Sequence, residues 1–410
     1  MTPPVTGALV GRRLAAVLAL FGIAYFLSLF FRSVNAILAP VLERDLGLGP
    51  SALGLLTATY FLGLGLMQVP IGLCLDAYGP RRVQASLLVI AAAGIGLFAI
   101  GEDVAILSIA RALIGIGLGG CLMAAFHAAA LWLAPERAPF ANGLYLAAGG
   151  LGTLAATAPV DLALMVMDWR TLFAIIAAAT LVLAGSIARV VPDPPVRSTV
   201  NWGERIAGIA TVVRNPAFGR YLPLTALTFA TGSSMQGLWA SAWLRDVGLQ
   251  DREAVALTLT AMAVALTAGS AAGGWASLVA ERVGLHLRHV VLGSAGLFLL
   301  AQAGLLLSSG DLSIAFWILF ALTYNAVTLS YALVARGVPV AFVGRSNSCM
   351  NTVVILSTFA VQYGLGVFFG LYQSEATGRI DTSAFPLGLG ALFLAQLAAF
   401  AWALLGARRG

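Results

Sequence analysis

Residues 72–82 read Gly72-Leu-Cys-Leu-Asp76-Ala-Tyr-Gly79-Pro-Arg81-Arg82, and this stretch decides how the rest of the sequence is interpreted. It is a short charged turn between two apolar runs, each long enough to cross a membrane. Gly79 suits a helix end that takes a left-handed backbone conformation. The two arginines lie where lipid headgroups and the cytoplasm would hold them, and Asp76 can face the positive N-terminus of a neighbouring helix. The stretch therefore predicts a cytoplasmic loop between two membrane-spanning helices.

The composition extends this prediction to the whole chain. Of the 410 residues, 60% are hydrophobic and only 10% are charged, and the mean hydropathy is +0.95. A soluble domain of this size could not cover its surface with so few charges. The net charge of +6 comes from arginines at the membrane surfaces, so it does not indicate a nucleic-acid partner. We predict an all-α polytopic membrane protein that acts in the lipid bilayer.

Twelve apolar runs are long enough to span a bilayer. No run alternates with period two along its length, which excludes a sheet of strands. We place the spans at residues 14–38, 51–75, 83–101, 104–128, 139–163, 170–190, 217–240, 254–277, 288–307, 312–334, 347–370 and 385–406.

The positions of the arginines predict the orientation of these spans. With the N-terminus inside, 16 of the 23 arginines fall in cytoplasmic segments and 5 in outer segments. Because cytoplasmic loops carry the excess of basic residues, both termini are predicted to be cytoplasmic. We expect a multi-pass protein of the bacterial inner membrane that acts as a monomer.

The chain is doubled. Its longest loop, residues 191–216, separates a first bundle of six spans, residues 1–190, from a second, residues 217–410. The first span of each half is followed by a similar stretch, Glu43-Arg44-Asp45-Leu-Gly-Leu and then Leu244-Arg245-Asp246-Val-Gly-Leu. Glu281-Arg-Val-Gly284 is a degraded echo of the loop at residues 72–82. Such a repeat predicts two six-helix bundles related by a pseudo-twofold axis along the membrane normal.

The spacing Gly-x-x-x-Asp-x-x-Gly-x-Arg-Arg resembles the loop signature of the major facilitator superfamily. Leu107-x-x-x-Arg111-x-x-x-Gly115-x-Gly117, in the fourth span, is similar to the superfamily's fourth-helix motif. The fifth span lacks the full glycine-proline signature of the drug-proton antiporters, which weakens an exporter interpretation. The resemblance implies a secondary transporter in which the loop is a conformational latch between the halves. It gives a gating role to the residues of this loop, Gly72, Asp76, Gly79, Arg81 and Arg82.

Three ionisable side chains lie inside the spans of the first half. Arg32, Arg111 and Asp161 are each on the order of 10 Å below the predicted outer surface, from the rise of 1.5 Å per helical residue. Ionisable groups at this depth are costly, so each is a candidate for function. Either they form a fixed ion pair that ties spans one, four and five together, or an arginine binds an anion while Asp161 exchanges a proton.

A copper importer is the alternative that the methionines raise. Met123 and His127 are four residues apart on one helix face, and Met235 and Met262 could contribute from the second half. The chain here faintly resembles the superfamily's copper importers for cytochrome oxidase assembly. However, their paired Met-x-x-x-Met and His-x-x-x-Met patterns are broken in this sequence.

Polar and aromatic side chains in the spans predict a cavity for a small organic solute, although each could instead bond between helices. Besides the two arginines, the predicted substrate-binding residues are Asn35, Tyr145, Gln236, Trp239, Tyr324 and Asn325.

We therefore expect a secondary transporter of a small organic anion, working by alternating access and coupled to protons, for example by symport. A drug or metabolite exporter is a further alternative. An enzyme is not expected, because no histidine lies near a plausible nucleophile within one span. A scaffold protein would carry an extra soluble domain, and no resident cofactor or metal is predicted.

Overall fold

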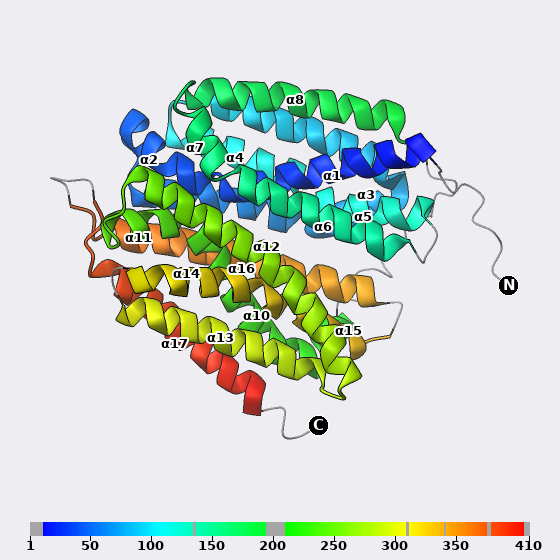
Figure 1. Cartoon of the computed structure of the whole chain (residues 1–410). Coiled ribbons are helices and arrows are strands. Elements are labelled where there is room, and N and C mark those ends of the chain that lie inside the picture. Colours follow the sequence, from blue (N-terminus) through cyan, green and yellow to red (C-terminus); the bar gives the residue numbers. More distant parts are fainter. Residues whose placement is uncertain are drawn as a thin grey trace. The chain divides into compact units, whose positions relative to one another are not determined.

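The structure is a computed structural model that describes residues 11–133, 137–193, 210–308, 311–339, 342–374 and 379–405 (Figure 1). Most of the predicted linker, residues 194–209, lies outside this part of the chain. The described residues are almost entirely helical, and their one β feature is an isolated bridge between Gln373 and Ile380. This confirms the all-α prediction.

The contacts between residues divide the chain into two compact units. Unit 1 comprises Met1–Val34 and Thr59–Asn201, and unit 2 comprises Asn35–Ala58 and Trp202–Gly410. The helices within unit 1 are α1 (Gly11–Ser33), α4 (Val104–Leu118), α5 (Cys121–Trp132), α6 (Ala138–Ala155), α7 (Ala158–Ala163) and α8 (Trp169–Val190). The helices within unit 2 are α2 (Asn35–Leu46), α10 (Pro216–Ser234), η1 (Met235–Trp239), α11 (Ala240–Asp246), α12 (Arg252–Arg282), α13 (Leu287–Leu307), α14 (Asp311–Tyr324), η2 (Asn325–Leu329), α15 (Ser330–Arg336), α16 (Val343–Gly370) and α17 (Ala384–Leu405). The long helix α3 (Pro50–Ile100) begins in unit 2 and continues in unit 1.

Nine helical stretches of the described chain are long and apolar enough to cross a membrane. One of them, α3, has 51 residues and contains two predicted spans. Its backbone bends between these two spans at Gly79, where φ is 77° and ψ is 164°. Two further predicted spans are interrupted helices, α6 with α7 and α10 with η1 and α11. Twelve spans are consistent with this arrangement. Large apolar side chains such as Leu307 and Val182 are exposed on the helices, as lipid-facing positions require.

Several spans are broken where the sequence predicted continuous helices. The first breaks at Val34, between α1 and α2, and the fifth breaks at residues 156–157, between α6 and α7. Pro159 explains the second break, because proline lacks the N–H that would continue the helical hydrogen bonds. The seventh span contains a π-helical turn and the tenth a 3₁₀ turn, η1 and η2 respectively. These breaks place polar residues at the helix interruptions of both units.

In unit 1, α1 packs against α6, α5, α8 and α4. In unit 2, α10 packs against α16 and α17, while α14 packs against α12 and α13. The segment 35–58, which the sequence assigned to the first bundle, makes contacts in unit 2, where α2 packs against η1 and α11. The predicted boundaries of the six-helix bundles, 1–190 and 217–410, stay a prediction.

Candidate functional site

Arg111 lies on α4, where glycines let this helix approach α3 closely. A Cβ atom on Gly115 would overlap the carbonyl group of Tyr60, so the two backbones touch only because glycine is present. Tyr60 in turn donates from its hydroxyl to the Ser28 carbonyl on α1 at 2.9 Å. Three helices of unit 1 are thus tied together around Arg111. The fourth-helix motif positions the arginine through these close backbone contacts.

The Arg111 side chain is enclosed, with 1% of its surface exposed. Its Nη1 donates to the Phe31 carbonyl at 3.4 Å, in the last turn of α1. Its guanidinium carbon lies 5.4 Å from the ring centroid of Phe98 and 6.0 Å from that of Tyr60. A carbonyl in the last turn of a helix has no partner within the helix, so Arg111 satisfies the end of α1. Cation–π contacts supply the rest of its surroundings.

The predicted ion pair between Arg111 and Asp161 is not formed. Within the described residues Arg111 contacts a backbone carbonyl and aromatic rings and makes no ion pair. Asp161 lies partly exposed on the short helix α7, after the break in the fifth span. The link between Arg111 and Asp161 in the predicted ion network of spans one, four and five is therefore wrong, because the guanidinium turns toward α1 instead. A link between Arg32 and Asp161 stays a prediction.

Arg32 lies beside Arg111 in the same corner of unit 1. It follows Phe31 in the chain, and its guanidinium carbon lies 5.9 Å from the ring centroid of Phe61. Phe61 adjoins Tyr60, and these two rings meet edge to face at 5.4 Å. Two guanidinium groups thus rest on consecutive aromatic rings of α3. Arg32 is partly exposed while Arg111 is enclosed, so Arg32 is the one that a solute can reach.

The other predicted substrate residue of unit 1 is Tyr145, on α6. It is 1% exposed, and its hydroxyl has no hydrogen-bond partner within the described residues. A buried hydroxyl without a partner loses about 1–3 kcal/mol relative to a paired one. The hydroxyl is therefore a ready donor for a polar ligand or a water molecule.

The predicted gating loop has the expected backbone. Gly79 has a positive φ of 77°, which confirms the conformational prediction for this glycine. Arg81 donates from Nε to the Ala188 carbonyl at 2.8 Å and pairs with Asp193 at 3.3 Å. Arg82 lies 3.6 Å from the same carboxylate. The arginines thus hold the end of α8 to the loop within unit 1.

Asp76 faces a histidine of the same unit. Its Oδ1 lies 4.0 Å from the Nδ1 of His127 on α5, and both side chains are partly exposed. His127 was predicted, with Met123, as a possible copper ligand, but its Nδ1 is directed at this carboxylate. Met235 and Met262 are fully buried in unit 2. The described residues contain no group of three or more His, Cys, Asp and Glu that could hold a metal ion. The copper alternative, whose ligands would be mostly methionines, stays a prediction.

In unit 2 the π-helical turn η1 carries two of the predicted residues, Gln236 and Trp239. Gln236 is 6% exposed, and neither atom of its amide has a hydrogen-bond partner within the described residues. Trp239 is buried, and its Nε1 donates to the Gln362 amide oxygen at 2.9 Å in the orientation that satisfies both amide atoms of Gln362. π-Helical turns occur often at functional sites because they shift side chains out of register. Here the turn leaves a buried amide available to a ligand.

The remaining predicted residues of unit 2 bond to protein groups or pack on them. The amide nitrogen of Asn35 donates to Thr57 Oγ1, and that of Asn325 donates to Ser270 Oγ, both at 2.7 Å. Tyr324 packs edge to face on a phenylalanine ring of α10 at 5.9 Å. Asn35 and Asn325 thus form interhelical hydrogen bonds, which was the alternative to a role in substrate binding.

Comparison with known proteins places this architecture in a family. The sequence profile described as "Major Facilitator Superfamily" matches residues 21–362. The chain belongs to this superfamily. The superfamily identity agrees with the loop and fourth-helix motifs described above.

Relatives of the chain are named as transporters. The chain is 26% identical over 407 residues to the "Probable sulfoacetate transporter SauU" of Cupriavidus necator, and the match covers 92% of each chain. It is 27% identical over 330 residues to a protein of Agrobacterium vitis that is named as a candidate tartrate transporter, with 75% of this chain and 71% of that protein covered.

Solved structures of transporters share the fold of this superfamily member. A bacterial homologue of the human lysosomal transporter Spinster matches with a TM-score of 0.78 and 17% identity, covering 98% of each chain. The nucleoside transporter NupG matches with a TM-score of 0.73 and 13% identity, covering 96% of this chain and 99% of that chain. At these identities the likeness establishes the fold alone.

One charged cluster of this superfamily member lies outside the site residues predicted from the sequence. Glu43 on α2 and Arg245 on α11 form an ion pair at 2.9 Å, although they are 202 positions apart. The repeated stretches at the ends of the first and seventh spans contained both residues. The sequence contained one signal for this cluster: the first stretch has a glutamate, Glu43, at the position where the second has Leu244, so the two copies differ by one charge.

Proposed function

We propose that this superfamily member is a secondary active transporter that carries a small organic anion across the bacterial inner membrane. Alternating access of the two predicted six-helix bundles, with both termini cytoplasmic, would move the solute. The observation that carries the proposal is the pair of guanidinium groups, Arg32 and Arg111, on neighbouring rings inside the membrane-spanning part of unit 1. Because Arg111 has no carboxylate partner within the described residues, this corner holds positive charge that an anion would balance.

Arg32 is the group proposed to bind the anion. Its planar guanidinium can grip a carboxylate or a sulfonate through two parallel hydrogen bonds, which an ammonium group cannot reproduce. Arg111 would hold the end of α1 and so place Arg32, because its own side chain is enclosed. The names of the relatives, a sulfoacetate and a tartrate transporter, support an anionic solute.

Uptake of radiolabelled sulfoacetate and tartrate into proteoliposomes tests the proposal. Arg32→Lys keeps the charge but loses the fork, and a charged hydrogen bond contributes about 1.5–3 kcal/mol, so the apparent affinity should fall about tenfold or more. Arg44→Lys is the matched control, since Arg44 is 72% exposed and pairs with Asp45. If Arg32→Ala transports normally, or if the solute proves neutral or cationic, the anion assignment is wrong.

Proton coupling is proposed to run through Asp161. A carboxyl group inside a membrane span can exchange a proton during the cycle more readily than it can stay charged. We expect a pH gradient to drive uptake by the wild type. Asp161→Asn should abolish the effect of the gradient while exchange of labelled for unlabelled solute persists. Uptake by Asp161→Asn that still follows the pH gradient would contradict this role.

A further inference from the structure

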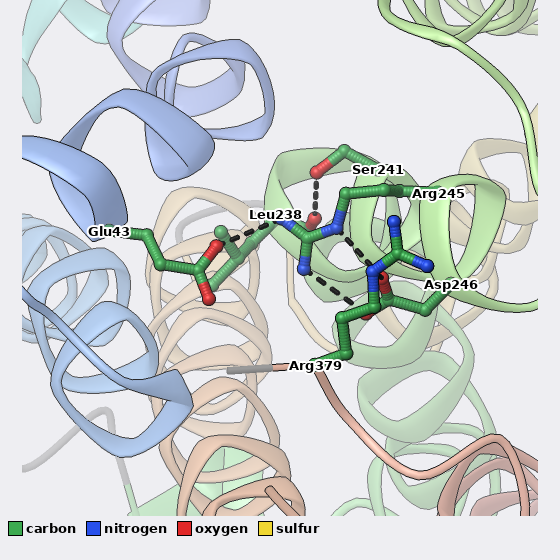
Figure 2. Close-up of polar contacts among 6 residues, drawn as sticks. All are labelled: Glu43, Leu238, Ser241, Arg245, Asp246 and Arg379. Atoms are coloured by element: carbon green, nitrogen blue, oxygen red, sulfur yellow. Dashed lines mark hydrogen bonds and ion pairs between the residues drawn. The ribbon is translucent and has the colours of Figure 1, made fainter. Parts of the chain in front are cut away.

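Arg245, at the end of α11, is held by a buried carboxylate. Its Nε lies 2.8 Å from Oδ1 of Asp246 and its Nη2 lies 3.1 Å from Oδ2, while the Asp246 side chain is 1% exposed (Figure 2). Arg379 approaches the same Oδ1 to 4.0 Å. Burial by itself would lower the pKa of Arg245, but the hydrogen bonds and charges of Asp246 and Glu43 outweigh it and raise the pKa. Asp246 is thus an anchor that fixes the guanidinium and keeps it charged.

The anchored guanidinium offers its remaining nitrogen to a second carboxylate. Nη1 of Arg245 lies 2.9 Å from Oε2 of Glu43, on α2 (Figure 2). The side chains are 27% and 26% exposed, respectively. A partly exposed ion pair with one hydrogen bond is screened by solvent and contributes little to stability. The contact with Glu43 is therefore the weakest that Arg245 makes, and another carboxylate could replace it.

The pair lies at a small cavity of about 20 Å³ within unit 2, room for about one water molecule. Pro50 and Leu53 from the start of α3 line it together with the predicted substrate residue Trp239. Glu43 and Arg245 line it as well. Removal of the Glu43 carboxylate from Arg245 would therefore widen this cavity beside Trp239 and remove the ion pair that joins α2 to α11.

Exchange of Glu43 for another carboxylate leaves the number of charges on Arg245 unchanged. In the observed arrangement the Arg245 guanidinium contacts the carboxylates of both Asp246 and Glu43. A solute carboxylate that takes the place of Glu43 restores the second of these contacts, in a partly exposed position where a solute can arrive. An arginine with a free edge suits a carboxylate or a sulfonate.

We propose that Arg245 is an anion-binding site, that Glu43 fills it as an internal carboxylate, and that a small carboxylate or sulfonate solute displaces Glu43 and so releases α2 from α11. This inference rests on the proposed anion transport and adds how the solute enters. The geometry that supports the inference is that the Arg245 guanidinium binds two carboxylates: two of its nitrogens bind the buried Asp246, and the third binds the partly exposed Glu43.

The chain contains its own matched control. Arg44 and Asp45 form the same arginine–aspartate neighbour pair, with the same Nε–Oδ1 distance of 2.8 Å. Arg44 is 72% exposed and contacts no second carboxylate within the described residues. A change at Arg44 alters the surface charge by as much as a change at Glu43 but leaves the proposed exchange intact.

The test is the rate at which a cysteine in the cavity reacts. Ala242 lines the cavity, and Ala242→Cys is introduced after the native Cys74, Cys121 and Cys349 have been replaced. The purified protein in nanodiscs, where both membrane faces are accessible, is treated with a charged maleimide. Acetate, sulfoacetate and uncharged glycerol are the probes. We expect both anions, and not glycerol, to raise the labelling rate several-fold.

Glu43→Gln removes the charge without changing the shape of the side chain. Its labelling rate should be high without any anion and should no longer respond to acetate or sulfoacetate, whereas Arg44→Gln should behave like the wild type. The inference is overturned if Glu43→Gln keeps the low wild-type rate, or if neither anion raises the wild-type rate. Thermal unfolding of each variant separates an opened cavity from a damaged fold, since Glu43→Gln should unfold within a few degrees of the wild type.

Failure of the inference and failure of the proposed function are distinguishable. Labelling of Glu43→Gln in the absence of any solute reports the contact between α2 and α11 whatever the transported molecule is. Loss of anion uptake in Arg32→Lys reports the binding role of Arg32, which lies in unit 1. A wild-type uptake of sulfoacetate with no response of the Ala242→Cys rate would overturn the displacement of Glu43 alone.

Discussion

Two neighbouring guanidinium groups differ in what surrounds them, and burial decides their roles. Arg111 donates to the Phe31 carbonyl and lies on the rings of Tyr60 and Phe98, enclosed from solvent. Arg32, the residue after Phe31, is partly exposed over a third ring. An enclosed arginine stabilises the helix end that it caps, whereas a partly exposed one can exchange a ligand.

Replacement of Arg111 should therefore affect stability more than affinity. Arg111→Lys loses the planar stacking and the bond to Phe31, and we expect the unfolding free energy to fall by about 1–3 kcal/mol. The affinity for sulfoacetate should stay within a few-fold of the wild type. Thermal unfolding and equilibrium binding of the purified variant measure the two effects. Arg32→Lys is the comparison and should show the opposite pattern; a loss of affinity in Arg111→Lys at unchanged stability would refute this assignment.

At the scale of the helix, glycines set how closely α3 and α16 cross in unit 2. A Cβ on Gly54 would lie 2.7 Å from the Cα of Gly366, and a Cβ on Gly366 would lie 2.8 Å from the Cα of Gly54. Ser51 Oγ donates to the Gly366 carbonyl at 3.3 Å in the same crossing. Helices in lipid associate through such close packing, because lipid chains are as apolar as the helix surfaces and the hydrophobic effect does not drive the helices together. The crossing fixes the start of α3, which lines the same cavity as Glu43.

Gly54→Ala should push these two helices apart. The added methyl group meets backbone atoms that cannot rotate away, and such overpacking typically costs about 1–3 kcal/mol. We expect a lower unfolding temperature and faster labelling of Ala242→Cys. Gly96→Ala is the control on the same helix, because a Cβ there meets no atom within 4 Å and alanine favours a helix by about 0.5–1 kcal/mol. Equal stability of Gly54→Ala and Gly96→Ala would show that the crossing tolerates a methyl group.

Over the whole chain, the two halves repeat local geometry as well as sequence. Arg44–Asp45 and Arg245–Asp246 share a 2.8 Å Nε–Oδ1 contact at the ends of the first and seventh spans. The loops that contain Gly79 and Gly284 both turn at a glycine of positive φ, 77° and 75°. A duplicated chain thus builds similar turns twice.

The acidic residues of the two halves differ in their partners. Glu43 has no acidic counterpart, because Leu244 occupies the equivalent position of the second half. Asp76 and Glu281 each precede their loop glycine by three residues, but Glu281 pairs with Arg336 whereas Asp76 faces His127. The two halves of the chain therefore differ in the charged contacts for which we propose functional roles, those of Glu43 and Asp76.

Asp76 is predicted to act in the conformational cycle and not in binding. Its carboxylate faces His127 just after the predicted second span, whereas Arg32 contacts Phe61, nearer the start of that span. Asp76→Asn should slow uptake strongly while the equilibrium affinity for sulfoacetate stays within a few-fold. Initial uptake rates in proteoliposomes and binding to the purified protein measure this. A large loss of affinity with a normal turnover would be incompatible with a gating role.

Composition and motif spacing determined the class of this protein from the sequence alone. Few charges over 410 residues require a bilayer around the chain, and the spacing around Asp76 and Arg111 was specific enough to indicate the superfamily. The left-handed turn at Gly79 was also predictable, because a positive φ is a local property that glycine tolerates best. These features depend on residues close together in the chain, where sequence patterns are informative.

Side-chain partners were decided by the tertiary structure. The sequence placed Arg111 and Asp161 at one depth, but the structure turns Arg111 to a backbone carbonyl of α1, because depth along a helix does not fix the direction around it. Glu43 and Arg245 both lie in the repeated stretches of the sequence, but the sequence does not predict that they pair. The packing of α2 against α11 brings them together across 202 positions. Some buried polar groups find a hydrogen-bond partner, and others, such as the Gln236 amide, do not. The difference depends on contacts between segments that are distant in sequence, and the packing of the whole chain sets these contacts.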